Sequence, residues 1–384
     1  MNEENQIFNK KFITTGYSYD NFVNIFQRTF KKVHINPELL EKLEIVFKES
    51  HNHRFRSYRD LIKFLHKMRK KLKYDVFVSK PKLFKHYRVL CEDKTIKPNH
   101  ELEKFLKMKG ARSRSGVISV TIFTAGHLMG GSVKTGGCPM DCHYCPFEKD
   151  KNGIPTQPRS YLSTEPGNMR AIQNKHHPVG QIYDRLFTLE NIGHVTADKN
   201  KASKIELIIS GGTFNFYPKD YIIWFVTCAY YACNTYYNWK TLRNMKSLEE
   251  EKNENKNTSI RIIGVTIETR PDYIIPKIKN IYNYGKKVVK KENIIQNILD
   301  GKNTESFKID FSTIKLFRKI GVTRVQIGIQ TTKDHILKKI NRGHTIEQAL
   351  DCMKYLKNNC FKIDIHIMPD LPGATPEIDK IMFD

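Results

Sequence analysis

The sequence lacks any apolar stretch that is long enough to cross a membrane or to direct secretion. The N-terminal stretch MNEENQIFNKKF has no apolar run after its charges, so we expect no signal peptide. The most apolar later stretch, residues 221–233, is too short to span a bilayer. Cysteine is also sparse, with 8 residues in a chain of 384, which argues against a small secreted fold built on disulfides. These absences predict an intracellular protein without membrane contact.

Acidic residues are scarce relative to basic ones. The chain has 40 Asp and Glu against 65 Lys and Arg, which leaves a formal net charge of +25. A charge of this size attracts polyanions such as nucleic acids. Lys, Asn and Ile are all abundant, so the codon bias of an AT-rich genome is an alternative source of the excess. The charge alone leaves both explanations open.

Residues 1–110 are predicted to form a basic, mostly helical region. Asn36 and Pro37 mark a helix start, because Asn caps helices and Pro fits their first turn. A second helix is expected over residues 57–77, with one apolar face made by Leu61, Phe64, Leu65 and Met68.

Basic residues gather in the same region and continue just beyond it. They are Arg69, Lys70, Lys71, Lys73, Lys80, Lys82, Lys85, Arg88, Arg112 and Arg114. Phe84 and Tyr87 lie between them, and cations mixed with aromatic rings that can stack on bases favour an RNA-binding surface. For the run that begins at Arg69, a solvated helix end is the alternative.

From residue 115 onward, β-rich segments alternate with helical ones. The predicted strands are residues 116–124, 204–212, 260–271, 323–330 and 361–373. Each is nearly continuous in Ile and Val, as strands buried on both faces are, and helices are expected between them, for example over 168–172 and 345–359. This alternation predicts a parallel sheet with helical crossovers. The expected fold is therefore α/β, a partial (β/α) barrel over residues 111–384.

Two segments are predicted to be insertions in this barrel. Residues 246–259 are charged and poor in apolar side chains, so we expect a disordered loop there. Residues 286–308 form the second insertion. Because the fifth strand lies close to residue 384, we also expect the barrel to be truncated at its C-terminus.

Three cysteines lie close together after the first predicted strand. Cys138, Cys142 and Cys145 have the spacing C-x-x-x-C-x-x-C, and three thiolates on a tight loop can hold three irons of a [4Fe–4S] cluster. The open fourth iron can then bind S-adenosylmethionine (SAM) and reduce it to a 5′-deoxyadenosyl radical, the chemistry of radical SAM enzymes. Zinc is the alternative, but it normally takes four ligands, and Cys228 and Cys233 fall in a predicted helix.

Further candidate SAM contacts lie near the cysteines and after the second strand. Tyr144, just before the last cysteine, can pack on adenine. Gly211 and Gly212, followed by Thr213, let the backbone approach a ligand closely, which suits the amino group of SAM. A plain turn is the alternative for the paired glycines.

The ends of the later strands supply the remaining candidates. Glu268 and Arg270, as a buried pair, can bind the ribose and the carboxylate of SAM, or can brace the mouth of the barrel; both explanations stay open. Gln326 lies within the fourth strand, and Gln330 at its end can reach the ligand. His366 in the fifth strand can equally be an ordinary core histidine.

Taken together, the motifs are more specific than any one of them. They are GGCPMDCHYCP, YLSTEPGNMRAI, KIELIISGGTF, GVTIETRPDY, RVQIGIQ, INRGHT and HIMPDLPG, in this order, between roughly residues 112 and 375. In order and content they resemble the catalytic subunit of the Elongator complex, a radical SAM family that modifies tRNA. Members of that family carry a C-terminal acetyltransferase-like domain, which we expect this chain to lack.

The resemblance implies a function and its components. The chain would act on carbon 5 of the wobble uridine of tRNA, with acetyl-CoA as the carbon donor. Cys138, Cys142 and Cys145 would be the cluster ligands and catalytic centre, and Lys204 matches a family lysine associated with acetyl-CoA. The expected partners are the anticodon stem-loop of tRNA and either Elongator-like subunits or a separate acetyltransferase-like chain.

The expected location is the cytoplasm, with the nucleus as the alternative. A competing hypothesis is a tRNA-binding or scaffold remnant of the family in which catalysis is impaired and the cluster is kept for structure.

Overall fold

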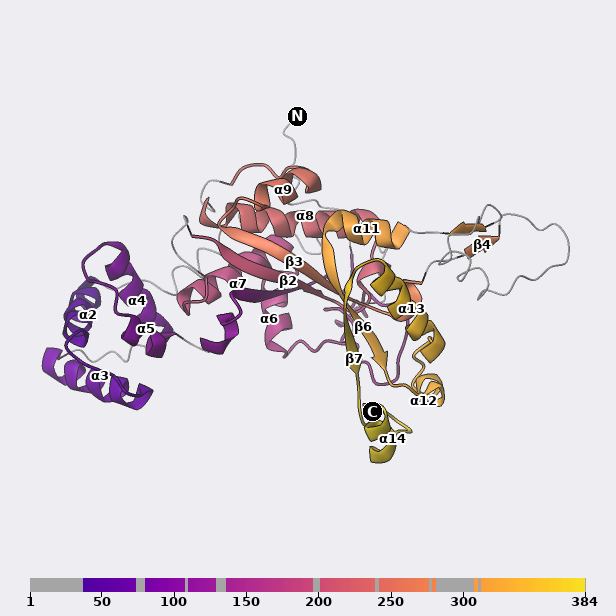
Figure 1. The fold of residues 1–384 in the computed structure, drawn as a ribbon, viewed down its shortest axis with the longest axis horizontal. Helices are drawn as coiled ribbons and strands as arrows, with labels where there is room; N and C mark the ends of the chain where they lie inside the picture. The colour runs from indigo at the N-terminus through magenta and orange to yellow at the C-terminus, as the bar shows by residue number, and fades with distance from the viewer. Residues whose placement is uncertain are drawn as a thin grey trace.

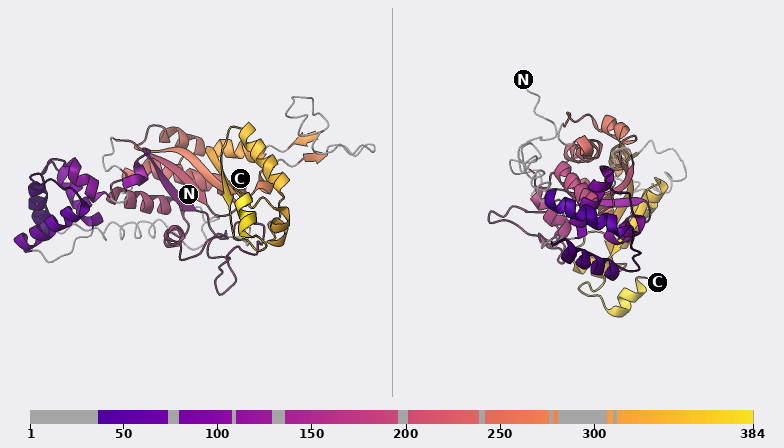
Figure 2. Two further views of the ribbon diagram at one scale, coloured as in Figure 1. Left: turned by 60° about the horizontal axis from the view of Figure 1, so that its bottom comes forward. Right: turned by 90° about the vertical axis from the view of Figure 1, so that its left-hand side faces the viewer.

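The computed structural model describes residues 37–73, 80–107, 110–128, 136–195, 201–238, 242–275, 278–280, 307–309 and 312–383. A twisted sheet occupies the centre of the molecule, and a group of N-terminal helices lies beyond one end of it (Figures 1 and 2).

The central sheet has five parallel strands in the order β1-β2-β3-β6-β7. They are β1 (Val117–Phe123), β2 (Ser203–Ser210), β3 (Ile260–Thr269), β6 (Val322–Gln330) and β7 (Lys362–Ile367). All five predicted strands are confirmed, and so is the parallel α/β arrangement. A separate antiparallel pair, β4 (Ile278–Asn280) and β5 (Phe307–Ile309), was not predicted.

Helices lie between the strands of the sheet, and one more, α14, follows the last strand. They are α6 (Pro166–Gln173), α7 (Pro178–Asn191), α8 (Lys219–Thr235), α9 (Leu248–Asn255), α11 (Ser312–Ile320), α12 (Asp334–Lys339), α13 (Ile346–Asn358) and α14 (Pro376–Ile381). Short 3₁₀ turns are η2 (Gly110–Ser113), η3 (Phe214–Phe216), η4 (Tyr236–Asn238) and η5 (Pro271–Tyr273). The helices expected around residues 168–172 and 345–359 are therefore confirmed as α6 and α13.

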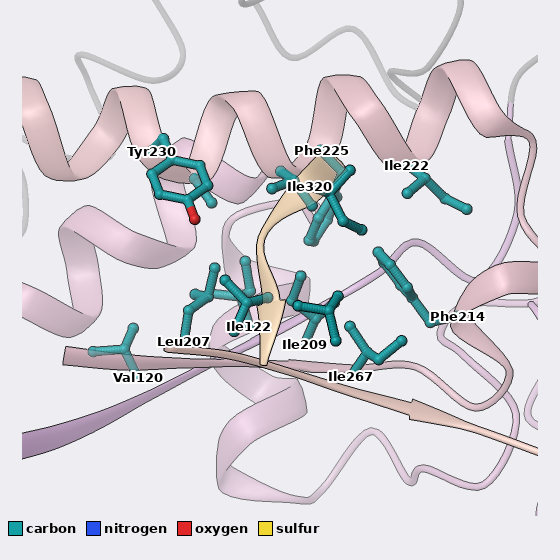
Figure 3. Packing of buried hydrophobic residues seen from close by; sticks show 14 of the residues in the cluster. Val120, Ile122, Leu207, Ile209, Phe214, Ile222, Phe225, Tyr230, Ile267 and Ile320 are labelled. Carbon is teal, nitrogen blue, oxygen red and sulfur yellow. The ribbon is translucent and has the colours of Figure 1, made fainter. Parts of the chain in front are cut away.

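Alternation along β2 separates an apolar face from a polar one. Leu207 and Ile209 are fully buried, and they pack beneath Phe225 of α8 (Figure 3). Successive side chains of a strand point to opposite faces, so Glu206 and Ser210 face the other side of the sheet. Strand β2 thus contributes one face to the main hydrophobic core and the other to the polar inner face of the barrel.

The N-terminal helices are α2 (Pro37–Ser50), α3 (Tyr58–Leu72), α4 (Lys80–Glu92) and α5 (His100–Leu106), and they have a hydrophobic core of their own. The predicted helix start at Pro37 is confirmed, while Asn36 lies outside the described residues. Helix α4 joins this lobe to the barrel, because Arg88 Nη1 donates to the Glu190 carbonyl at 2.5 Å. The Lys85 ammonium lies 5.2 Å from the centre of the Phe187 ring.

The aromatic residues of α4 do not form an RNA-stacking surface, so that part of the prediction is wrong. Phe84 is 6% exposed and Tyr87 1% exposed. The Tyr87 ring packs edge-on against Phe47 of α2, with ring centres 5.3 Å apart. The apolar side of α4 is needed to close the helical core, and it cannot also stack on bases.

Residues 246–259 are not a disordered loop, which corrects a second prediction. They contain α9, and Ser247 caps it in a capping box with Glu250. Glu251 is fully buried and accepts hydrogen bonds from Arg243 Nη1 at 2.6 Å and Nη2 at 2.8 Å. A segment with few apolar side chains is ordered here by charge pairing and by one buried leucine, Leu248, which its composition does not reveal.

The strands depart from the expectation that each is buried on both faces, and β7 does so most. Its residues are intermediate or exposed, and Ile365 is 47% exposed; β7 is one of the two edge strands of the sheet. Of the second predicted insertion, residues 286–306 lie outside the described residues. In the part of the chain that the structure describes, no helix is long and apolar enough to cross a bilayer.

Candidate active site

A cavity of about 550 Å³ opens at the carboxyl ends of the strands, and most of the candidate residues line it. They are Cys138, Tyr144, Cys145, Gly212, Thr213, Glu268, Arg270 and Gln330. These residues follow or end β1, β2, β3 and β6. Because the carboxyl ends of parallel strands meet at one edge, the fold brings together segments that are far apart in the sequence.

The cysteine loop is held by hydrogen bonds to two distant segments. The Gly137 carbonyl accepts from the Thr213 N–H at 3.2 Å, and the Ile340 carbonyl accepts from the His143 N–H at 3.1 Å. His143 Nδ1 also lies 3.1 Å from the carbonyl of Lys339. The loop is therefore fixed between the turn after β2 and the end of α12.

Two of the three thiols contact hydroxyl groups. Thr213 Oγ1 donates to Cys138 Sγ at 3.4 Å, and Cys145 Sγ lies 2.9 Å from Ser160 Oγ. Burial raises the pKa of the Cys145 thiol, and the Ser160 hydroxyl partly offsets this rise. The thiol is thus kept protonated until a metal displaces the proton.

Cys142 is approached by two guanidinium groups instead. It is 4% exposed, with Arg342 Nη1 at 3.7 Å and Arg270 Nη1 at 3.9 Å from its Sγ. Burial alone would lower the pKa of Arg270, but the Asp272 carboxylate, whose Oδ1 lies 3.1 Å from Arg270 Nε, raises it above the usual value. Arg270 is therefore charged beside Cys142.

The paired glycines after β2 are required by the geometry of the turn. A Cβ at Gly211 would lie 1.8 Å from Thr124 Oγ1. Gly212 has a φ of 83°, in the left-handed region that favours glycine, and it forms part of the cavity wall. The turn therefore brings bare backbone to the cavity, as close binding of a ligand would need.

Glu268 and Arg270 are not paired with each other, which corrects the expected pair. Glu268 Oε1 accepts from Ser210 Oγ at 2.7 Å, and Oε2 accepts from the Tyr161 hydroxyl and from the Gly211 N–H at 3.4 Å. These bonds tie the Glu268 carboxylate to the glycine turn. Bracing is thus one role of Glu268, although the side chain also lines the cavity.

The other candidates line the same cavity. The Tyr144 ring packs against the cluster of Ile336, Leu337, Ile340 and Leu371, and burial raises the pKa of its phenol to about 12. Gln330 has a φ of 76°, which is uncommon for a residue other than glycine, and ends β6 at the cavity. Gln326 and His366 complete this side of the wall.

Lys204 lies elsewhere, at the amino end of β2. It lines a second, more open groove of about 1130 Å³ with Lys201, Arg88 and Lys107. Lys204 lies six positions before Ser210 on β2, which corresponds to roughly 20 Å along the strand. The structure therefore does not bring Lys204 together with the cysteines.

The residues of the first cavity fit a cluster better than a single metal ion. Among the described residues, no three His, Cys, Asp or Glu side chains converge where one ion could bind. In a [4Fe–4S] cluster each thiolate binds a different iron, so the sulfurs need not converge. All three cysteines are free thiols around or beside the cavity, and two arginines lie where thiolate charge would develop.

Sequence reasoning assigned no role to three residues of this site. Ser160 and Tyr161 contact Cys145 and Glu268, and Arg342 contacts Cys142. The motifs YLSTEPGNMRAI and INRGHT included Tyr161 and Arg342, but nothing local indicated their partners.

Comparison with known families gives an independent result. The model of the radical SAM superfamily matches residues 228–384 of this chain, which include β3, β6 and β7 but not the cysteine loop. The role of the three cysteines is therefore a proposal.

Curated relatives extend the likeness over more of the chain. The tRNA uridine(34) acetyltransferase of Methanocaldococcus infernus is 32% identical over 279 residues, which are 72% of this chain and 41% of that protein. Elongator complex protein 3 of Dictyostelium discoideum is 28% identical over 275 residues, covering 71% and 40% of the two chains. This chain thus spans about two fifths of the length of these relatives.

Among solved structures, the chain is similar to the archaeal Methanocaldococcus infernus Elp3 with an N-terminal deletion. That match has a TM-score of 0.44 and 27% identity, and it covers 70% of this chain and 41% of the other.

Proposed function

We propose that this chain takes part in modifying carbon 5 of the wobble uridine of tRNA. The premise is that it carries a radical SAM domain homologous to those of archaeal tRNA uridine(34) acetyltransferases and Elongator complex protein 3. The single observation that carries the proposal is the meeting of the cysteine loop and the glycine turn in one cavity. Acetyl-CoA is the proposed carbon donor, in keeping with the name of the archaeal relatives.

Cys138, Cys142 and Cys145 would hold the iron–sulfur cluster. When bound, the cluster supplies one-electron reduction of the sulfonium of SAM. The Thr213 and Ser160 hydroxyls would orient the first and last thiolates, through the contacts at 3.4 and 2.9 Å. The hydrogen bonds of the loop to the turn after β2 and to the end of α12 would hold the cysteines in place beside the cavity.

The remaining cavity residues would bind and orient SAM. The backbone at Gly212 and Thr213 suits its amino group, and Tyr144 offers a ring for the adenine. Arg270 supplies a positive charge for the carboxylate, and Gln330 supplies amide donors and acceptors at the end of β6. Glu268 would fix the glycine turn and hydrogen-bond the ribose with its remaining acceptor capacity.

The N-terminal helices, within the proposed region 1–110, would contact the phosphates of the anticodon stem-loop. Lys63, Lys67, Lys70 and Lys71 are exposed on α3 and can form such contacts. Bases of an anticodon loop are already unpaired, so presenting uridine to a site costs little. We assign binding of acetyl-CoA to Lys204 together with a further acetyltransferase-like domain, Elongator-like subunits or another chain. The proposed location is the cytoplasm or the nucleus.

The test is anaerobic reconstitution with iron and sulfide, then reduction with dithionite in the presence of SAM and an assay for 5′-deoxyadenosine. We expect product from the wild-type chain and none from Cys142→Ala. Cys352→Ala is the matched control, because Cys352 is a buried residue of α13 that does not line the cavity. Addition of tRNA and acetyl-CoA should raise the yield.

A cluster that forms without cleaving SAM would contradict the proposed activity and would favour a tRNA-binding remnant. Product that persists in Cys142→Ala would contradict the assignment of the cysteines.

A further inference from the structure

Arg342 is a buried cation without a carboxylate partner among the residues that the structure describes. Its side chain is 8% exposed, and it lines the cavity. Its Nη2 donates to the Gly328 carbonyl at 2.6 Å, and its Nη1 lies 3.7 Å from Cys142 Sγ. A buried charge is costly unless an anion accompanies it, so the Cys142 thiolate is the natural counter-charge.

The neighbouring backbone makes room for the guanidinium. A Cβ at Gly328 would lie 2.5 Å from Arg342 Nη2, so only glycine admits the group at this distance. The carbonyl of Arg342 accepts a hydrogen bond from Arg270 Nη2. Arg342 is thereby fixed through both its side chain and its main chain.

One donor of Arg342 still lacks an acceptor. Its Nε is buried and has no hydrogen-bond partner in the described part of the chain. Leaving a buried donor unpaired is costly. The described residues therefore leave part of the hydrogen-bonding capacity of this guanidinium unused.

The two arginines at Cys142 differ in how much of their charge is free. Arg270 is already paired with Asp272, at 3.1 Å between Nε and Oδ1. Arg342 has no such partner among the described residues, so its charge acts on the sulfur with less compensation. Arg342 is thus the stronger influence on Cys142.

We propose that Arg342 sets the reduction potential of the iron–sulfur cluster by hydrogen-bonding the Cys142 thiolate. Reduction adds a negative charge to a cluster whose thiolates are already negative. A charged donor at a ligand sulfur stabilises the reduced form and raises the potential. This role rests on the proposed function, and it makes Arg342 a positioning and tuning residue.

The test measures the midpoint potential of the reconstituted cluster by redox titration followed by electron paramagnetic resonance, without SAM. Arg342→Gln should shift the reduction equilibrium at least tenfold toward the oxidised form, which is about 59 mV more negative for a one-electron couple. Arg342→Lys keeps the charge but loses the planar guanidinium with its paired donors. The potential of this variant should therefore lie between those of the wild type and Arg342→Gln.

Arg324→Gln is the matched control. Arg324 also lies on the polar face of the sheet, but it pairs with Glu206 at 3.1 Å and Asp364 at 2.6 Å and contacts no cysteine. We expect its shift to be less than twofold. An equal shift in Arg324→Gln and Arg342→Gln would overturn the proposal, because the effect would then not depend on the Cys142 contact.

The remaining outcomes also decide the matter. If Arg342→Gln takes up no iron, Arg342→Lys carries the test, and a wild-type potential in that variant overturns the proposal. If neither variant takes up iron, Arg342 is required for the site to form and not for its potential, which also overturns it. A wild-type chain that takes up no cluster would instead be a failure of the proposed function.

Discussion

The two ends of the parallel sheet hold their polar groups in different ways. At the carboxyl ends of the strands, Glu268 and Arg270 are fixed by hydrogen bonds within the protein and line an enclosing cavity. At the amino end, Lys201 and Lys204 are exposed and line an open groove beside α4. Strand β2 joins the two ends across roughly 20 Å.

The difference separates two kinds of contribution to function. Fixed donors and acceptors in a partly closed cavity can hold a cofactor in one geometry, because they do not need to reorganise. Exposed lysines attract anions, but solvent and salt screen their charge. We therefore expect the chemistry at the carboxyl ends and only electrostatic attraction at the amino end.

The largest effect should follow removal of a cluster ligand. Cys145→Ser should reduce iron content after anaerobic reconstitution at least tenfold, because a serine oxygen is a poor replacement for a thiolate on iron. Cys360→Ser, which changes an exposed cysteine after α13, is the control and should keep the wild-type iron content. Iron analysis of both purified variants checks this, and equal losses would remove the distinction between the two cysteines.

The amino end also contains one buried ionic cluster, which sharpens the comparison. Arg243→Ala would leave the buried Glu251 carboxylate without its guanidinium partner and should lower the free energy of unfolding by about 3 kcal/mol or more. Lys246→Ala, which removes a half-exposed partner of Glu254, should cost less than about 1 kcal/mol. Urea titrations followed by circular dichroism measure both, and similar losses would mean that burial of Glu251 is not decisive.

At the carboxyl side, a buried histidine should make stability depend on pH. Burial lowers the pKa of His176 from 6.5 to about 4, so the unfolded chain binds a proton between these values while the folded chain does not. Stability should therefore be complete above pH 6.5 and fall as the pH drops toward 4, by up to about 3 kcal/mol from this group. Urea titrations at several pH values measure this slope, which should flatten in His176→Asn; an unchanged slope would assign the effect to other groups.

The smallest effects should be on the rate of SAM cleavage, where loss of a single hydroxyl at the cavity is compared with loss of a lysine in the open groove. Thr213→Val removes the donor to Cys138 and should slow SAM cleavage about fivefold, from the loss of about 1 kcal/mol of hydrogen bonding. Lys201→Ala should leave the rate within twofold. Rates of 5′-deoxyadenosine formation check both, and a larger loss in Lys201→Ala would contradict the separation of the two ends.

Much of the framework could be predicted from residues close together in the sequence. Runs of Ile and Val bounded by glycine predicted five strands, and their alternation with helices predicted a parallel sheet. The rule that loops at strand ends build sites then placed Cys138, Gly212, Glu268 and Gln330 together. These inferences succeeded because the side-chain period of a strand is a local property of the sequence. The direction of each strand follows from the topology, that is, from the order of strands and helices.

The failures share a different physical cause. Phe84 and Tyr87 were expected at the surface, but α4 needs them to close its core against α2. Residues 246–259 were expected to be disordered, but Arg243 and the buried Glu251 order α9. In both cases a partner outside the segment decides the outcome.

The sequence by itself therefore determined the strands, their parallel arrangement and the edge at which the candidate site lies. Only the tertiary structure decided which side chains touch there: it paired Arg270 with Asp272 instead of Glu268, and it brought Arg342 to Cys142. Periodicity along a chain reports which face a residue occupies. Contacts between residues far apart depend on how whole elements pack, and that packing is a property of the folded chain.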